Sequence, residues 1–104
     1  MIKVSVMYPN SSEVKFDTGY YKNTHLPMIV EALGDTLKGL EFNVGLGGKT
    51  PSEPAPYIAM AHLTFDSLES FKDSFGPHAV KFAADVPNYS NVQGEIQISD
   101  IIKI

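Results

Sequence analysis

A short segment near the N-terminus places an acid, a phenol and an imidazole at helical spacing. Asp17, Tyr21 and His25 stand at positions i, i+4 and i+8. On a helix they fall within roughly 80° of one another, and Tyr20 lies beside them. Histidine titrates near neutral pH without help, and a neighbouring phenol can polarise a carbonyl or pass a proton. This spacing predicts His25, Tyr21 and Tyr20 as catalytic groups; alternatively, Tyr21 and His25 fill the edge of a core.

A second group of candidates lies in the last third of the chain. His78 directly follows the pair Gly76-Pro77, and irregular helical backbone often accompanies a site. Asp85 and Tyr89 follow within a short stretch, and we expect all three to contact a substrate. The alternative is that His78 is solvated, Asp85 is a structural hydrogen-bond acceptor and Tyr89 fills the core.

The sequence predicts neither a metal site nor a cofactor. The three histidines are far apart, there is no cysteine, and no HxxxH or HxH pair is present to preorganise ligands, although distant ligands could still converge. We expect His62, on a strand, to be an interface residue. The GLGGK segment at 45–49 lacks the ending and the following helix of a phosphate-binding loop.

The hydrophobic pattern predicts four strands and two interrupted helices. Period-two alternation marks strands at 2–8, 40–46 and 57–65 and a last strand through 96–104. The first helix runs from an Asp17 cap towards Leu33 with a kink near His25 to Pro27, and it carries a buried stripe of Leu26, Ile29, Val30 and Leu33. The second begins at an Asp66 or Ser67 cap and is interrupted at Gly76-Pro77, and residues 47–56 form an exposed loop.

This order predicts one α+β domain over 1–104, a ferredoxin-like βαββαβ fold in which both helices cover one face of a four-stranded antiparallel sheet. The second face is too apolar to stay in water and too polar for a dry core; it collects Ser5, Met7, Ile58, Met60, His62, Thr64 and Ile101. A symmetric partner sheet would cover it, so we expect a homodimer.

Composition excludes several kinds of partner. The 104 residues carry a net charge of −4, and all eight basic residues are lysine, so no arginine is present for phosphates or base edges. We therefore expect no nucleic-acid partner. The N-terminal apolar run ends at Pro9-Asn10, too short for a signal or spanning segment, so we expect a cytoplasmic protein without a membrane partner.

Three segments follow one another along the chain: FDTGYYKNTHLPMIVEALG, GLGGKTPSEPAPYIAMAHLTFDSLESF and AADVPNYSNVQGEIQISDI. Together they resemble the EthD family, named for ethyl tert-butyl ether degradation. The family pattern is matched by Phe16, Asp17, Tyr20, Tyr21, His25 and Pro27 and by Asp85, Pro87, Asn88 and Tyr89. The resemblance implies the dimeric α+β barrel superfamily, whose members include cofactor-free cyclases, monooxygenases and lactone isomerases.

Two functions are compatible with these features. One is a cofactor-free enzyme, an oxidoreductase, lyase or isomerase, that performs acid and base chemistry on a small apolar substrate bound between sheet and helices in the degradation of small ethers or aromatics. The other is a non-catalytic accessory or carrier protein for an oxidative degradation pathway. A haem or quinol role is disfavoured, because the chain has no tryptophan and only His25 could serve a haem.

Overall fold

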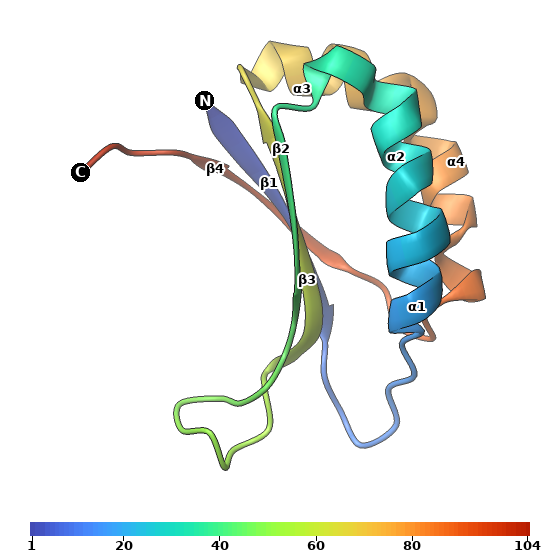
Figure 1. Ribbon diagram of the computed structural model, residues 1–104, viewed down its shortest axis with the longest axis vertical. Coiled ribbons are helices and arrows are strands. Elements are labelled where there is room, and N and C mark those ends of the chain that lie inside the picture. The colour runs from blue at the N-terminus through green and yellow to red at the C-terminus, as the bar shows by residue number, and fades with distance from the viewer.

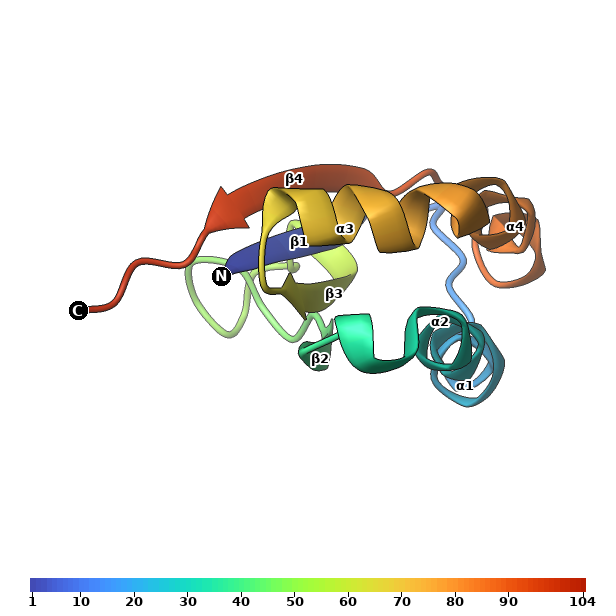
Figure 2. The ribbon, with the colours of Figure 1, turned by 90° about the horizontal axis from the view of Figure 1, so that it is seen from above.

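The computed structural model describes residues 1–104. In chain order its elements are β1 (Ile2–Pro9), α1 (Thr18–Tyr20), α2 (Leu26–Leu33), β2 (Gly39–Val44), β3 (Tyr57–Phe65), α3 (Leu68–Phe75), α4 (Ala79–Ala84) and β4 (Glu95–Asp100). The strands form one antiparallel sheet in the order β2-β3-β1-β4. All helices lie on one side of it (Figure 1), in two rows formed by α1 with α2 and by α3 with α4 (Figure 2). The predicted α+β class and the βαββαβ element order are confirmed.

The first helix begins and bends where the sequence predicts. The Asp17 carboxylate accepts a hydrogen bond from the backbone N–H of Tyr20 at 3.0 Å, which caps α1. Ahead of Pro27, residues Tyr21–His25 form a π-helical turn, whose hydrogen bonds reach back five residues instead of four. Proline has no N–H to continue a regular α-helical ladder, so the wider turn lies where that ladder is broken. The helix ends at Gly34, whose φ of 54° favours glycine.

The apolar stripe of α2 is narrower than expected. Leu26, Ile29 and Leu33 are buried, but Val30 is 46% exposed, so the prediction that it is buried was wrong. A helix that packs on one surface buries a stripe of limited width, and Val30 lies at its margin.

The second helix is interrupted at the predicted position. The Ser67 side chain accepts a hydrogen bond from the backbone N–H of Ser70 at 3.0 Å and caps α3. A 3₁₀ turn over Gly76–His78 then separates α3 from α4. This break places Asp85 directly after the end of α4, opposite the first helix.

Two strands are shorter than their patterns predict. β4 ends at Asp100, because its partner β1 begins at Ile2 and the last backbone contact is from Ile101 N–H to the Met1 carbonyl at 3.0 Å. The tail 101–104 is therefore exposed and projects from the body (Figure 1). β2 ends at Val44, where a loop rich in glycine and proline begins.

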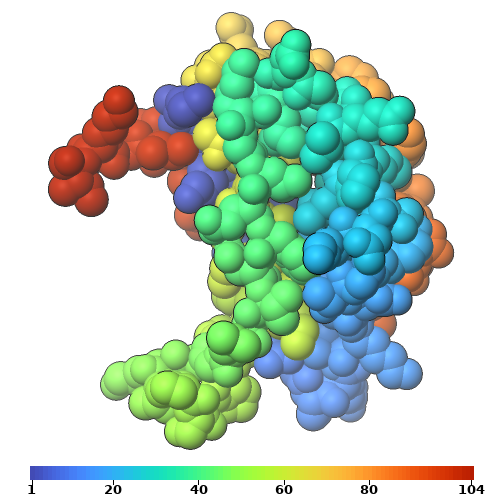
Figure 3. Space-filling view, in the orientation of Figure 1, coloured from blue at the N-terminus to red at the C-terminus, as the bar shows by residue number.

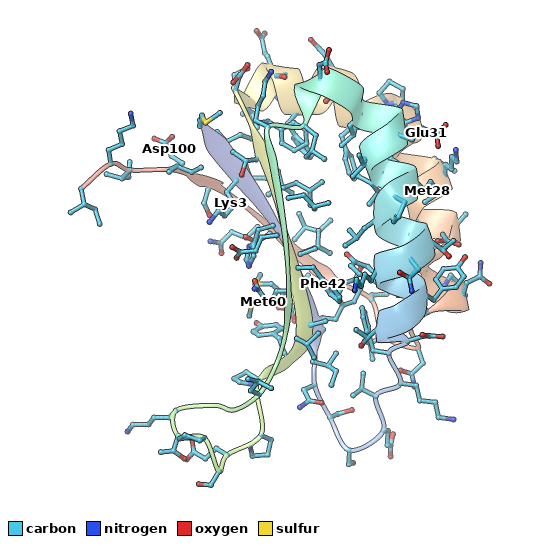
Figure 4. All side chains as sticks on the ribbon, viewed as in Figure 1. Lys3, Met28, Glu31, Phe42, Met60 and Asp100 are labelled. Atoms are coloured by element: carbon cyan, nitrogen blue, oxygen red, sulfur yellow. The ribbon has the colours of Figure 1, made fainter.

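The core lies between the sheet and the helices. From the sheet it takes one face of each central strand, and from the helices their inner sides. Its buried apolar members are Val4, Tyr8, Tyr21, Leu26, Ile29, Leu33, Ala59, Ala61, Leu63, Phe65, Phe82 and Tyr89. Phe42 of β2 also points toward the helices (Figure 4), and its ring centre lies 4.8 Å from that of Tyr21.

The other face of the sheet has no covering element. Lys3 and Met60 point out of this open face (Figure 4), and Ser5 Oγ lies 2.8 Å from His62 Nδ1 near its middle. Ile101, expected on this face, instead follows the end of β4. The outline of the molecule is concave here, between the C-terminal tail and the 45–56 loop (Figure 3).

Candidate acid–base site in an apolar cavity

A buried histidine and a carboxylate from opposite helical rows form the centre of the candidate site. His25, the last residue of the π-helical turn, is 3% exposed. Its Nδ1 lies 2.8 Å from Oδ2 of Asp85. A carboxylate accepts only, so Nδ1 carries a hydrogen, and in the neutral imidazole Nε2 is left as the acceptor. The structure thus brings together His25 from the first predicted group and Asp85 from the second.

Three donors hold the Asp85 carboxylate. Besides His25, the Tyr20 hydroxyl donates to Oδ1 at 2.7 Å and the Asn88 side-chain amide donates to the same oxygen at 2.9 Å. Burial alone would raise the pKa of Asp85. The hydrogen bonds from Asn88, His25 and Tyr20 outweigh it, so the pKa lies below its ordinary value. The carboxylate is therefore ionised at neutral pH.

Two buried phenols continue the chain of polar groups beyond His25. The Tyr89 hydroxyl lies 3.5 Å from His25 Nε2 and 2.8 Å from the Tyr8 hydroxyl. Burial raises the pKa of both phenols. They therefore stay protonated at neutral pH and can donate hydrogen bonds.

These groups line a cavity of about 290 Å³ between the sheet and both helical rows. Its walls are mainly apolar, with polar atoms supplied by Tyr8, Tyr21 and Tyr89, by His25 and by Gln93. The lining residues are Val6, Tyr8, Tyr21, His25, Ile29, Leu63, Phe75, Ala79, Phe82, Ala83, Val86, Tyr89, Gln93, Gly94 and Ile96. Exposed Ala83 and Gln93 belong to this lining, so the cavity reaches the surface between α4 and β4.

The other predicted residues occupy different positions around this cavity. Tyr21 lines it and stacks on the His25 imidazole, with ring centres 5.0 Å apart, and burial raises its pKa. Tyr20 is outside the lining, stacked on Tyr89, and its hydrogen bond to Asp85 raises its pKa. His78 is also outside the lining and stacks on Phe82 at 5.7 Å.

Sequence reasoning missed two residues of the site. The alternation places Tyr8 only within the first strand, and Asn88 enters only through the family pattern. Tyr8 alternates with Val4 and Val6, which places it on the inner face, but the pattern contains no signal for a contact with Tyr89, 81 residues away.

Fold and site together define a small βαββαβ protein with an apolar cavity and, at its wall, a buried histidine bonded to a partly exposed aspartate. The EthD domain model matches residues 11–93, and the chain belongs to the EthD family. An EthD-like protein from Ralstonia eutropha JMP134 is 32% identical, with 98% of this chain and 92% of that one covered and a TM-score of 0.92. The resemblance stated from the motifs is confirmed.

More distant structures share the fold. An ethyl tert-butyl ether D family protein from Bacillus halodurans C-125 is 17% identical, with 98% and 99% of the two chains covered and a TM-score of 0.75. An Arabidopsis thaliana protein is 11% identical, with 99% and 96% covered and a TM-score of 0.67. No curated protein matches the chain. None of the helices has the length and apolar character needed to span a membrane.

Proposed function

We propose that this protein binds a small apolar organic molecule in the cavity and that His25 exchanges a proton with it. The observation that carries the proposal is the placement of His25: Nδ1 is held by an ionised carboxylate, and the ring lines an apolar cavity. A carboxylate that orients an imidazole also stabilises its protonated form, as a general base requires.

The surrounding groups have distinct roles in this proposal. Asp85 fixes the imidazole, while Tyr20 and Asn88 position Asp85 through their hydrogen bonds to Oδ1. Tyr21 restricts the imidazole by stacking. Tyr89, protonated at neutral pH, donates a hydrogen bond to a ligand oxygen. Nε2 of His25 then takes a proton from the carbon next to a carbonyl and delivers it to the carbonyl oxygen, which converts the ketone to its enol without a cofactor.

A non-catalytic carrier would use the same cavity without proton exchange. The apolar lining favours it as the second candidate, since burial of a hydrocarbon alone would retain the ligand. In either role we place the protein in the degradation of small ethers or aromatics.

We also propose that the open face of the sheet pairs with a second copy in a dimeric α+β barrel. Met7, Ile58 and Met60 on this face are only half-buried in the single chain, and a Ser5–His62 hydrogen bond lies among them. The concave outline around this face offers room for a second copy (Figure 3).

Binding is tested by thermal unfolding with naphthalene, toluene and ethyl tert-butyl ether as probes. A ligand at 100 times its Kd adds about 2.7 kcal/mol, a Tm increase of roughly 12 °C for a chain of this size. Ala83→Phe narrows the cavity, whereas Ala84→Phe alters an exposed neighbour outside the lining. We expect at least one probe to raise Tm in wild type and Ala84→Phe but much less in Ala83→Phe. No shift with any probe, or equal shifts in both variants, contradicts the proposal.

Proton exchange is tested with 2-tetralone, a two-ring ketone, in heavy water. If His25 acts as a base, the protein accelerates the replacement of hydrogen by deuterium next to the carbonyl, and His25→Gln abolishes the acceleration. If the ketone binds but its hydrogen is replaced no faster than in the absence of protein, the catalytic role is contradicted and the carrier role is favoured.

A further inference from the structure

Three polar groups of the cavity lie close together at one end. Tyr8, Tyr89 and His25 are linked by distances of 2.8 and 3.5 Å, and the rest of the wall, apart from Tyr21 and Gln93, is apolar. A ligand that matches this wall has a polar atom at this end and a hydrocarbon body, since a further polar atom buried against the apolar part of the wall would lack a partner.

The polar end has no positive side chain for an anion. None of the eight lysines is in the lining, and the chain has no arginine. Nδ1 of His25 is already bonded to Asp85, whose carboxylate is negatively charged. A carboxylate or phosphate would lose its hydration without gaining a cation, so the cavity selects an uncharged ligand.

At this end of the cavity the Tyr89 hydroxyl can serve as the hydrogen-bond donor and His25 Nε2 as the acceptor. With Nδ1 bonded to Asp85, Nε2 of neutral His25 accepts. Tyr8 can donate to the Tyr89 oxygen at 2.8 Å, which leaves the Tyr89 hydrogen free to point toward Nε2. The distance of 3.5 Å between the Tyr89 hydroxyl and His25 Nε2 is longer than that of a good hydrogen bond. A ligand oxygen that lies beside these two atoms can be about 2.8 Å from each of them.

A ligand oxygen at this position must donate a hydrogen bond to Nε2 and accept one from Tyr89. A hydroxyl does both, whereas a carbonyl or ether oxygen can only accept. The cavity volume of about 290 Å³ sets the size of the body. A cavity of about 150 Å³ holds benzene, so this one suits two fused rings or one ring with a short alkyl chain.

We infer that the cavity takes an uncharged phenol or enol of about two-ring size, whose hydroxyl binds between His25 Nε2 and the Tyr89 hydroxyl. This deepens the proposed function and rests on it: an enol is what proton removal from a bound ketone would yield, and a naphthol has the same oxygen on a flat two-ring body.

The test is calorimetric titration at pH 7 with four matched two-ring compounds. 2-Naphthol can donate and accept, 2-methoxynaphthalene can only accept, naphthalene can do neither, and 2-naphthoate is an anion. We expect 2-naphthol to bind roughly tenfold more tightly than naphthalene, as two neutral hydrogen bonds allow, with 2-methoxynaphthalene clearly weaker than 2-naphthol and 2-naphthoate weakest. In Tyr89→Phe we expect 2-naphthol to lose several-fold in affinity and naphthalene to change by less than about twofold.

Different failures of this series have different meanings. Equal affinities for naphthalene and 2-naphthol would overturn the hydroxyl site and leave the apolar cavity of the proposed function intact. Equal affinities for 2-naphthol and its methyl ether would overturn donation to His25, and tight binding of 2-naphthoate would overturn the preference for an uncharged ligand. Absence of binding by all four compounds would contradict the proposed function itself and this inference with it. The comparisons among ligands use the wild-type protein, so they hold even if Tyr89→Phe fails to fold.

Discussion

Replacing Asp85 by asparagine tests whether this carboxylate holds His25. In the wild type its two oxygens accept three hydrogen bonds, from Tyr20 at 2.7 Å, His25 at 2.8 Å and Asn88 at 2.9 Å. Asparagine keeps one oxygen for Tyr20 and Asn88 but places an N–H₂ group opposite Nδ1 of His25. Two donors then face each other unless the imidazole moves its proton to Nε2.

The size of the effect follows from the charge of the carboxylate and its partial exposure. Hydrogen bonds to charged groups contribute about 1.5 to 3 kcal/mol, against about 1 for neutral ones. The Asp85 side chain is 14% exposed, so water screens it only in part. We expect Asp85→Asn to lower the free energy of unfolding by about 2 kcal/mol at pH 7, which corresponds to a Tm decrease of roughly 10 °C.

The effect should depend on pH in a defined direction. The pKa of Asp85 is lowered in the folded state, so its stabilisation is fully present above the ordinary value of 3.8 and is lost as pH falls through the lower folded value. Urea unfolding of wild type and Asp85→Asn from pH 7 down to pH 3 should show a difference that shrinks at the acid end.

The matched control is Asp73→Asn, which removes one negative charge from an exposed position in α3. We expect it to change stability by less than about 0.5 kcal/mol. The reasoning is refuted if Asp85→Asn is as stable as Asp73→Asn at pH 7, or if its deficit is the same at pH 3 as at pH 7.

Three further changes test other parts of the structure. In Gly94→Ala the new Cβ would lie 2.9 Å from Val6 Cγ1 and 3.1 Å from the Tyr8 ring, so we expect a lower Tm and weaker 2-naphthol binding; unchanged values would contradict this close packing. Met60→Glu on the open face should convert the expected dimer to a monomer in sedimentation equilibrium. The control Val80→Glu, at a position 84% exposed on α4, should leave the dimer intact. A monomeric wild-type protein would contradict the dimer. His78→Ala should change the affinities for naphthalene and 2-naphthol by less than about twofold relative to wild type, because His78 is outside the lining. A larger loss of affinity would indicate that His78 does contact the ligand.

The fold was predictable because local patterns agreed with one another. Period-two alternation marked β1 and β3 almost to the residue, and a cap and a proline marked the start and the bend of the first helix. The patterns failed where a neighbour decides the outcome. Ile102 and Ile104 alternate like strand residues, but β1 has no residue left to pair with them.

The site was predictable only in part, because its central contact is between distant segments. The helical spacing placed Tyr21 and His25 on one face, and they do stack. Asp17 caps α1 as predicted, but the acid that binds His25 is Asp85, 60 residues later. That pairing depends on how α4 packs beside the first helix, which no local pattern encodes.

The sequence alone left open whether His25 is a core residue or a site residue. In the structure His25 is 3% exposed and also lines the cavity, so burial and the proposed site role are compatible. Loss of stability in His25→Ala would therefore not argue against a site, because a packed imidazole leaves both a void and an unpaired Asp85 when it is removed.

The most direct measurement is an NMR titration of the histidine side chains with 2-naphthol. The chain has three histidines in separate environments: His25 at the cavity, His62 on the open face and His78 on the surface beside Phe82. With ¹⁵N-labelled imidazoles, the Nε2 signal of His25 is predicted to move to saturation while those of His62 and His78 stay in place. A His25 signal that remains unchanged at saturating ligand, or movement confined to His62 or His78, would contradict the proposal that His25 and the cavity form the binding site.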